Sequence, residues 1–158
     1  APAAPDWRRR AEMMRILLSG FIAGVLSVLI FHQGSAFLLY HIGNEIPAVV
    51  AVFGKAAAPF NMAPTKPLGV PAIASQCFWG GVWGVVLAFI LSRQVFPALA
   101  FGAIFGAIAL TVVALTLVPY LKGLPGWNGN IPWRGLLFNG AWGFGAALLL
   151  LKPLSLRA

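Results

Sequence analysis

FPALAFGAIFGAIALTVVALTLVPYL, residues 96–121, is a segment without a single charged side chain. At about 1.5 Å per residue, a helix of this length exceeds the ~30 Å thickness of the hydrocarbon core of a bilayer. A helix on the surface of a soluble protein would need a polar face, which this segment lacks. The segment therefore predicts a transmembrane helix and places the chain among integral membrane proteins.

Three further apolar runs cover residues 16–40, 70–91 and 135–151. We therefore expect an all-α integral membrane protein, a single domain of 158 residues with four transmembrane helices in a bundle. Residues 1–15 form a polar N-terminal segment, which we expect in the cytoplasm. Residues 42–69 contain four prolines, which prevent a continuous helix, yet part of this connection is too apolar for a solvated loop. We expect an interfacial or re-entrant connection there.

Composition supports the membrane assignment. Hydrophobic residues make up 60% of the chain and charged residues 9%, whereas soluble domains carry about a quarter charged residues. The formal charge of +8 would suggest nucleic-acid binding in a soluble protein. Here the basic residues lie at the edges of apolar runs, a pattern typical of membrane orientation. We expect the lipid bilayer as a partner and no nucleic acid.

The basic residues also predict which side of the membrane each end occupies. Seven of them flank the two ends of the chain and the turn between the second and third spans, against four in the other connections. Because cytoplasmic loops carry an excess of Lys and Arg, we expect a multi-pass protein of the bacterial inner membrane with both termini in the cytoplasm. The seven are Arg8, Arg9, Arg10, Arg15, Arg93, Lys152 and Arg157; the four are Lys55, Lys66, Lys122 and Arg134.

Small residues four positions apart occur in every predicted span. In lipid such pairs let two helix backbones approach closely, so that van der Waals contact can hold the helices together. The pattern does not separate packing within the chain from docking on another protein. The pairs are Gly20 and Gly24, Gly80 and Gly84, Gly102 and Gly106, and Ala141 and Gly145.

The order of these motifs is compatible with two related hairpins. Residues 81–84, GVWG, resemble residues 140–143, GAWG, and each tetrapeptide follows a connection that contains proline. The spans that precede them share a glycine pair at the same spacing. A duplication of this kind would be a parallel repeat, because both hairpins begin on the same side of the membrane.

His32 and Gln33 are the strongest candidates for a functional site, because polar side chains within a span are costly unless they face protein, a ligand or water. One interpretation is a set of hydrogen bonds across the bundle. Another is contact with a ligand, a quinone or a pigment. The polar side chains available as partners are Ser75, Gln76 and Asn139.

The sequence supports neither a haem site nor an enzyme. His41 is the other histidine, and nine residues of helix place it on the opposite side from His32, so one haem cannot bind both. All three carboxylates lie outside the predicted spans, and no catalytic or phosphate-binding motif is present. We expect no enzymatic activity, no metal and no cofactor, and leave contact with lipid, quinone or pigment open.

Four short motifs resemble a family of small proteobacterial membrane proteins to which no activity is assigned. They are FHQG at residues 31–34, GVP at 69–71, GVWG at 81–84 and NGAWG at 139–143. The resemblance implies an inner-membrane location and four helices. It supplies no binding residues.

The preferred function is a non-catalytic accessory or structural subunit of a larger inner-membrane complex of photosynthetic or respiratory type. Small-residue faces on all four spans and the apolar connection favour contact with other membrane subunits. Two alternatives are a small transporter or channel subunit, with polar residues lining a path, and a protein that binds quinone or pigment.

Overall fold

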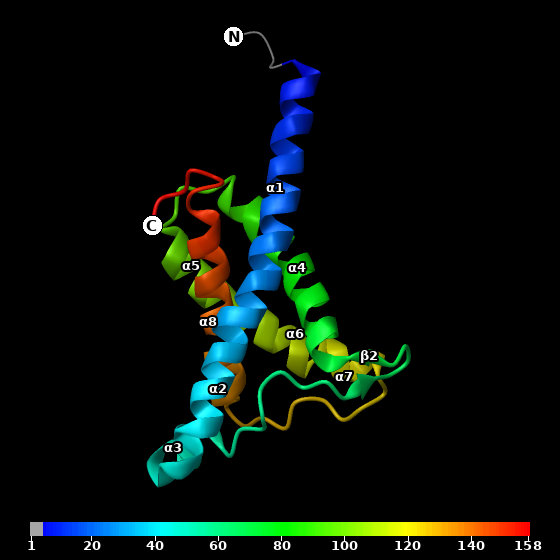
Figure 1. Cartoon of the computed structure of the whole chain (residues 1–158), viewed down its shortest axis with the longest axis vertical. Coiled ribbons are helices and arrows are strands. Elements are labelled where there is room, and N and C mark those ends of the chain that lie inside the picture. The colour runs from blue at the N-terminus through cyan, green and yellow to red at the C-terminus, as the bar shows by residue number, and fades with distance from the viewer. Residues whose placement is uncertain (1–4) are drawn as a thin grey trace.

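The computed structural model describes residues 5–158, and they are mostly helical (Figure 1). Three helical segments are long and apolar enough to cross a membrane: Asp6–Glu45, Ala72–Leu91 and Ala98–Leu121. The prediction of a helical chain with apolar helices of membrane length is confirmed for these three segments.

The first segment is one nearly continuous helix. It consists of α1 (Asp6–Ser27), a π-helical turn η1 (Val28–His32) and α2 (Gln33–His41). The helix begins ten residues before the predicted span, because the charged N-terminal residues are themselves helical. The carboxylate of Asp6 forms an ion pair with the guanidinium of Arg10 at 2.8 Å. Opposite charges four residues apart stabilise a helix. Residues 1–4 of the predicted N-terminal segment lie outside the described residues.

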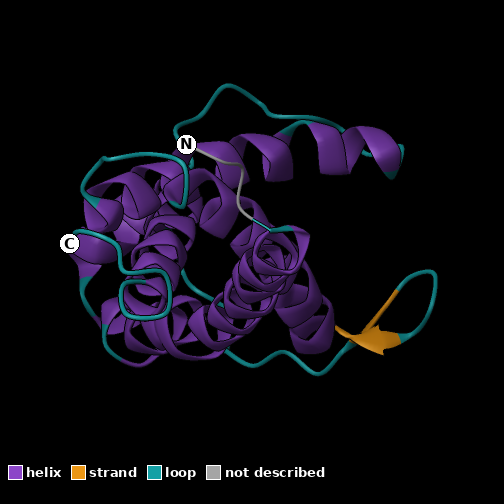
Figure 2. Cartoon of the chain, turned by 90° about the horizontal axis from the view of Figure 1, so that it is seen from above, coloured by secondary structure: helices purple, strands orange, loops and turns teal. Residues whose placement is uncertain are grey.

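The connection after this helix contains short elements of regular structure on either side of the irregular residues 54–63. A 3₁₀ turn, η2 (Gly43–Glu45), leads to α3 (Pro47–Phe53), which begins with proline at its first position. Gly54 ends α3 at a φ of +68°, where glycine avoids steric cost. An antiparallel pair of short strands, β1 (Pro64–Thr65) and β2 (Val70–Pro71), projects from the packed helices (Figure 2).

The second apolar segment is α4 (Ala72–Leu91). The third consists of α5 (Ala98–Phe105), a second π-helical turn η3 (Gly106–Leu110), α6 (Thr111–Leu115) and α7 (Leu117–Leu121).

Proline explains the break between α6 and α7. Pro119 has no N–H to donate to the carbonyl of Leu115, and the backbone N–H of Trp127 donates to that carbonyl instead at 3.1 Å. This hydrogen bond ties the following loop to the end of the third segment.

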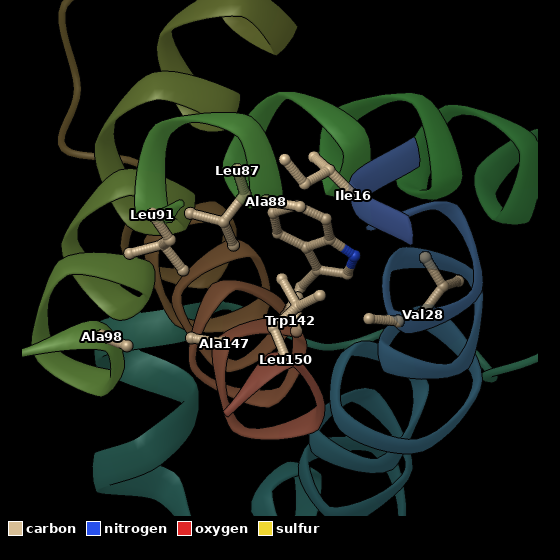
Figure 3. Close-up of a cluster of buried hydrophobic side chains, with 11 residues drawn as sticks. Ile16, Val28, Leu87, Ala88, Leu91, Ala98, Trp142, Ala147 and Leu150 are labelled. Atoms are coloured by element: carbon tan, nitrogen blue, oxygen red, sulfur yellow. The ribbon is translucent and has the colours of Figure 1, made fainter. Parts of the chain in front are cut away.

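The last helix, α8 (Trp133–Leu150), is not among the three membrane-length segments. Its 18 residues include Arg134 and Asn139, which lower its hydropathy. Yet α8 contributes most to the core, with Trp142 only 1% exposed and Ala146, Ala147 and Leu150 fully buried among residues of α1, α4 and α5 (Figure 3). A helix that falls short of the membrane-length criteria therefore supplies much of the buried core.

Candidate functional site

The closest contact between α1 and α4 consists of glycine backbones. A methyl group added to Gly20 would lie 2.8 Å from the carbonyl oxygen of Gly84, and one added to Gly24 would overlap the carbonyl of Gly80. In the reverse direction, a methyl group on Gly84 would overlap the carbonyl of Gly20. The two helices run antiparallel with their glycine pairs face to face, and no larger side chain fits between them.

A similar contact joins the third segment to α8. A methyl group on Gly102 would lie 2.5 Å from the carbonyl oxygen of Gly143, and one on Gly106 would overlap the carbonyl of Asn139. The residues of α8 that pack on this glycine pair are thus Asn139 and Gly143.

The structure places the predicted pair Ala141 and Gly145 elsewhere. Gly145 lies against the ring of Phe31, which belongs to η1, and Ala141 is half-buried. The pair Ala141 and Gly145 therefore does not form the contact with Gly102 and Gly106. That contact uses Asn139 and Gly143, each two residues earlier in α8. The i, i+4 spacing is the same, but the helix face differs.

The two glycine contacts use equivalent positions of the similar motifs. Aligning GVWG (81–84) with GAWG (140–143) makes Gly84 equivalent to Gly143 and places Gly80 at the position of Asn139. The contact of Gly20 with Gly84 then corresponds to that of Gly102 with Gly143, and Gly24 with Gly80 to Gly106 with Asn139. The second pair of helices thus repeats both the equivalent partners and their order along the chain.

Two buried hydrogen bonds join α8 to α1. The indole Nε1 of Trp142 donates to the carbonyl of Gly24 at 3.0 Å, and the hydroxyl of Ser27 donates to the carbonyl of Trp142 at 2.6 Å. Sequence reasoning missed Ser27, although it lies on the same helix face as Gly20 and Gly24. Trp142 is a cross-link between helices, whereas the equivalent Trp83 is half-buried with its ring 6.1 Å from that of Phe105.

Gln33 is the centre of a polar cluster. Its side chain is nearly fully buried, and its Nε2 donates to Oε1 of Gln76 at 2.7 Å. Its Oε1 accepts the backbone N–H of Phe60 at 2.7 Å. Gln33 thus joins the first helix to α4 and to the connection. His32 lies beside it, with Nδ1 3.4 Å from Nε2 of Gln33.

Two of the other predicted polar residues lie outside this cluster. Asn139 donates from Nδ2 to the hydroxyl of Thr111 at 2.9 Å. Ser75 is half-buried, and within residues 5–158 no hydrogen bond joins its side chain to Gln33. The ring of His32 packs 5.4 Å from that of Phe138.

Further hydrogen bonds fix the 42–69 connection, and sequence reasoning did not anticipate them. The side chain of Asn44 both donates to the carbonyl of Ala56, at 3.0 Å, and accepts its N–H, at 2.8 Å. Arg134 donates to the carbonyl of Lys55 at 2.7 Å. Asn44 and Arg134 are polar residues at or beside an apolar connection, which is a signal for hydrogen bonding. The sequence does not identify the partner of either residue.

A hollow of about 430 Å³ lies between the end of α3, α6 and the start of α8. Phe53, Leu115 and Trp133 give it apolar walls, and Arg134 and the Thr111–Asn139 pair give it polar groups. Its size is within the range of small-molecule pockets, about 300–1,000 Å³.

Across residues 5–158, no group of three His, Cys, Asp or Glu side chains is placed to hold a metal ion. Every buried side-chain nitrogen and oxygen in this range has a hydrogen-bond partner.

Comparison with protein families, with curated proteins and with solved structures finds no match to this chain.

Proposed function

We propose that the chain is a non-catalytic subunit of a larger bacterial inner-membrane assembly, of photosynthetic or respiratory type, and that it spans the membrane four times. In this proposal α8 is the fourth span, since its 18 residues reach about 27 Å and its polar Asn139 is paired with Thr111. The helices form a bundle of two related hairpins, α1 with α4 and the third segment with α8. The equivalent glycine contacts support this relation.

One observation carries the proposal: the connection between α2 and α4 is fixed in place and yet presents exposed apolar side chains. Met62 is 67% exposed and Leu68 84% exposed. Hydrogen bonds from Asn44, Gln33 and Arg134 hold the backbone at residues 55–60, before Met62. The pairing of β1 with β2 holds the hairpin that carries Leu68. Exposed apolar surface on a segment held in place in this way is compatible with contact to another protein.

The closed interior favours a subunit over a channel formed by one chain. At the two glycine contacts the helix backbones touch each other, and the buried side-chain nitrogens and oxygens of residues 5–158 are hydrogen-bonded within the chain. A channel or transporter subunit would therefore require an oligomer with a pore between chains. The outward faces of the helices are apolar, which is compatible with a subunit of a larger assembly and with an oligomer of this chain alike.

A second candidate function is binding of a quinone or pigment. The hollow beside Asn139 favours it, because it combines aromatic walls with the polar groups of Thr111 and Arg134. A purified protein that retains such a compound, and loses it with Asn139→Leu, would support this function.

Purification in mild detergent tests the subunit proposal. The wild-type protein should copurify with a defined set of membrane proteins. The double variant Met62→Asn/Leu68→Asn should stay folded in the membrane but leave the complex, because both side chains are exposed within the chain itself. Met14→Asn is the matched control, since Met14 is 55% exposed on α1, away from the connection. The proposal fails if the wild-type protein purifies alone as a homo-oligomer that conducts a solute in liposomes.

Reporter fusions test the proposed orientation. A reporter at the C terminus and one in the turn at Arg93 should both give a cytoplasmic signal, and one inserted at Lys66 a periplasmic signal. A periplasmic signal at the C terminus would contradict both the four-span count and the orientation.

A further inference from the structure

A second hollow, of about 260 Å³, lies at the end of the molecule near the C terminus. Three parts of the chain line it: α1, the turn between α4 and α5, and residues 154–157. The C-terminal segment is held there, since the backbone N–H of Ala98 donates to the carbonyl of Arg157 at 2.9 Å. Residues far apart in the sequence thus build one site.

The hollow has a net positive charge. Arg15 and Arg157 line it, and in the described part of the chain neither forms an ion pair with a carboxylate within 4.0 Å. Glu12 also lines it and offsets one of the two positive charges. Gln94 and Ser155 add an amide and a hydroxyl that can donate hydrogen bonds. These groups are typical of a site for a phosphate with one or two negative charges.

The rim of the hollow is apolar. Val95 and Phe96 line it and are exposed, and the side chains of Leu154 and Leu156 contribute to its wall. A soluble anion would gain nothing from exposed apolar residues at the mouth, whereas a lipid places its acyl chains there. The volume is just below that of typical pockets for small molecules, so it can hold a phosphate with its glycerol but not a complete lipid.

We propose that this hollow binds the phosphate-bearing headgroup of an anionic phospholipid, with Arg15 and Arg157 on the phosphate and the acyl chains beyond Val95 and Phe96. Basic pockets between transmembrane helices bind such headgroups in other membrane proteins. The site differs in position and chemistry from the connection that carries the subunit proposal. It does not depend on that proposal.

Native mass spectrometry of the full-length protein in detergent tests the site, with phosphatidylglycerol and phosphatidylcholine as probes. Phosphatidylglycerol should bind more tightly than phosphatidylcholine. Arg15→Gln and Arg157→Gln should each weaken phosphatidylglycerol binding about fivefold. Glu12→Gln should strengthen it, because it removes the opposing charge.

Arg93→Gln is the matched control. Arg93 lies in the same turn as Gln94 and Val95, but its guanidinium stacks on Phe89, 4.3 Å from the ring centroid, and does not line the hollow. The control should bind phosphatidylglycerol like the wild type. Opposite effects of Glu12→Gln and Arg15→Gln cannot both arise from unfolding.

Three results would overturn the proposal. The first is equal binding of the two lipids. The second is an equal loss with Arg93→Gln and Arg15→Gln, which would indicate a general surface charge effect. The third is displacement of the lipid by inorganic phosphate at millimolar concentration, which would assign the hollow to a free anion.

Discussion

Replacing Gly24 by alanine should separate α1 from α4. The added methyl group would overlap the carbonyl oxygen of Gly80 and lie 2.8 Å from its carbonyl carbon and 3.0 Å from the Cα of Gly81. Ordinary van der Waals contact begins at 3.4 Å, so the backbones must move apart by at least 0.6 Å, the difference between 3.4 and 2.8 Å. The obstacle is backbone on both sides, and no flexible side chain can move away to relieve the overlap.

The expected cost combines two effects. Overpacking of a tight contact costs about 1–3 kcal/mol. Moving α1 also weakens the hydrogen bond from Trp142 to the carbonyl of Gly24, which is worth about 1 kcal/mol. Together these effects give about 2–4 kcal/mol, or a decrease in Tm of about 5–15 °C for a chain of this size.

Thermal unfolding of the purified protein in detergent measures this effect. Gly34→Ala is the matched control, because Gly34 is also helical, and a methyl group added there meets no atom within 4 Å. The control should unfold at the wild-type temperature or slightly above it, since alanine favours helix over glycine by up to about 1 kcal/mol. Equal Tm values for Gly24→Ala, Gly34→Ala and the wild type would refute the backbone contact between α1 and α4.

Three further predictions concern individual side chains. Trp142→Phe removes the indole N–H that binds Gly24 and should lower stability by about 1–2 kcal/mol, measured by the same unfolding assay; no change would mean that the buried hydrogen bond is absent. Gln33→Leu leaves the N–H of Phe60 without its partner and should increase hydrogen exchange at residues 56–63, with unchanged exchange in α8 as the internal control; unaltered exchange at Phe60 would contradict the cluster. The purified chain should show no Soret band, because His32 packs on Phe138 while His41 lies on the exposed side of α2; a haem band lost on His32→Ala would disprove this.

Much of the fold could be predicted from the sequence because hydropathy is a local property. The length of an apolar run decides whether a helix can cross a bilayer, and residues 96–121 meet that condition without reference to any other segment. Small residues at i, i+4 likewise mark where close helix contact is sterically allowed. Both kinds of information are present within a single stretch of chain.

The choice of helix face could not be predicted in the same way. Every residue from Gly140 to Ala147 in α8 is either small or aromatic. Spacing alone therefore could not separate the pair Ala141 and Gly145 from the pair Asn139 and Gly143. The π-helical turns η1 and η3 also rotate the residues that follow them, and no sequence pattern indicated either turn.

The sequence by itself determined that the chain has helices of membrane length, where small residues occur on them and which residues are polar within them. Tertiary structure alone decided that Gly24 meets Gly80, that Trp142 joins α8 to α1 and that Arg15 and Arg157 line one hollow. The physical reason is that burial in lipid depends on the composition of one segment. A contact between two segments depends instead on the rotation and crossing of both helices, which no single segment specifies.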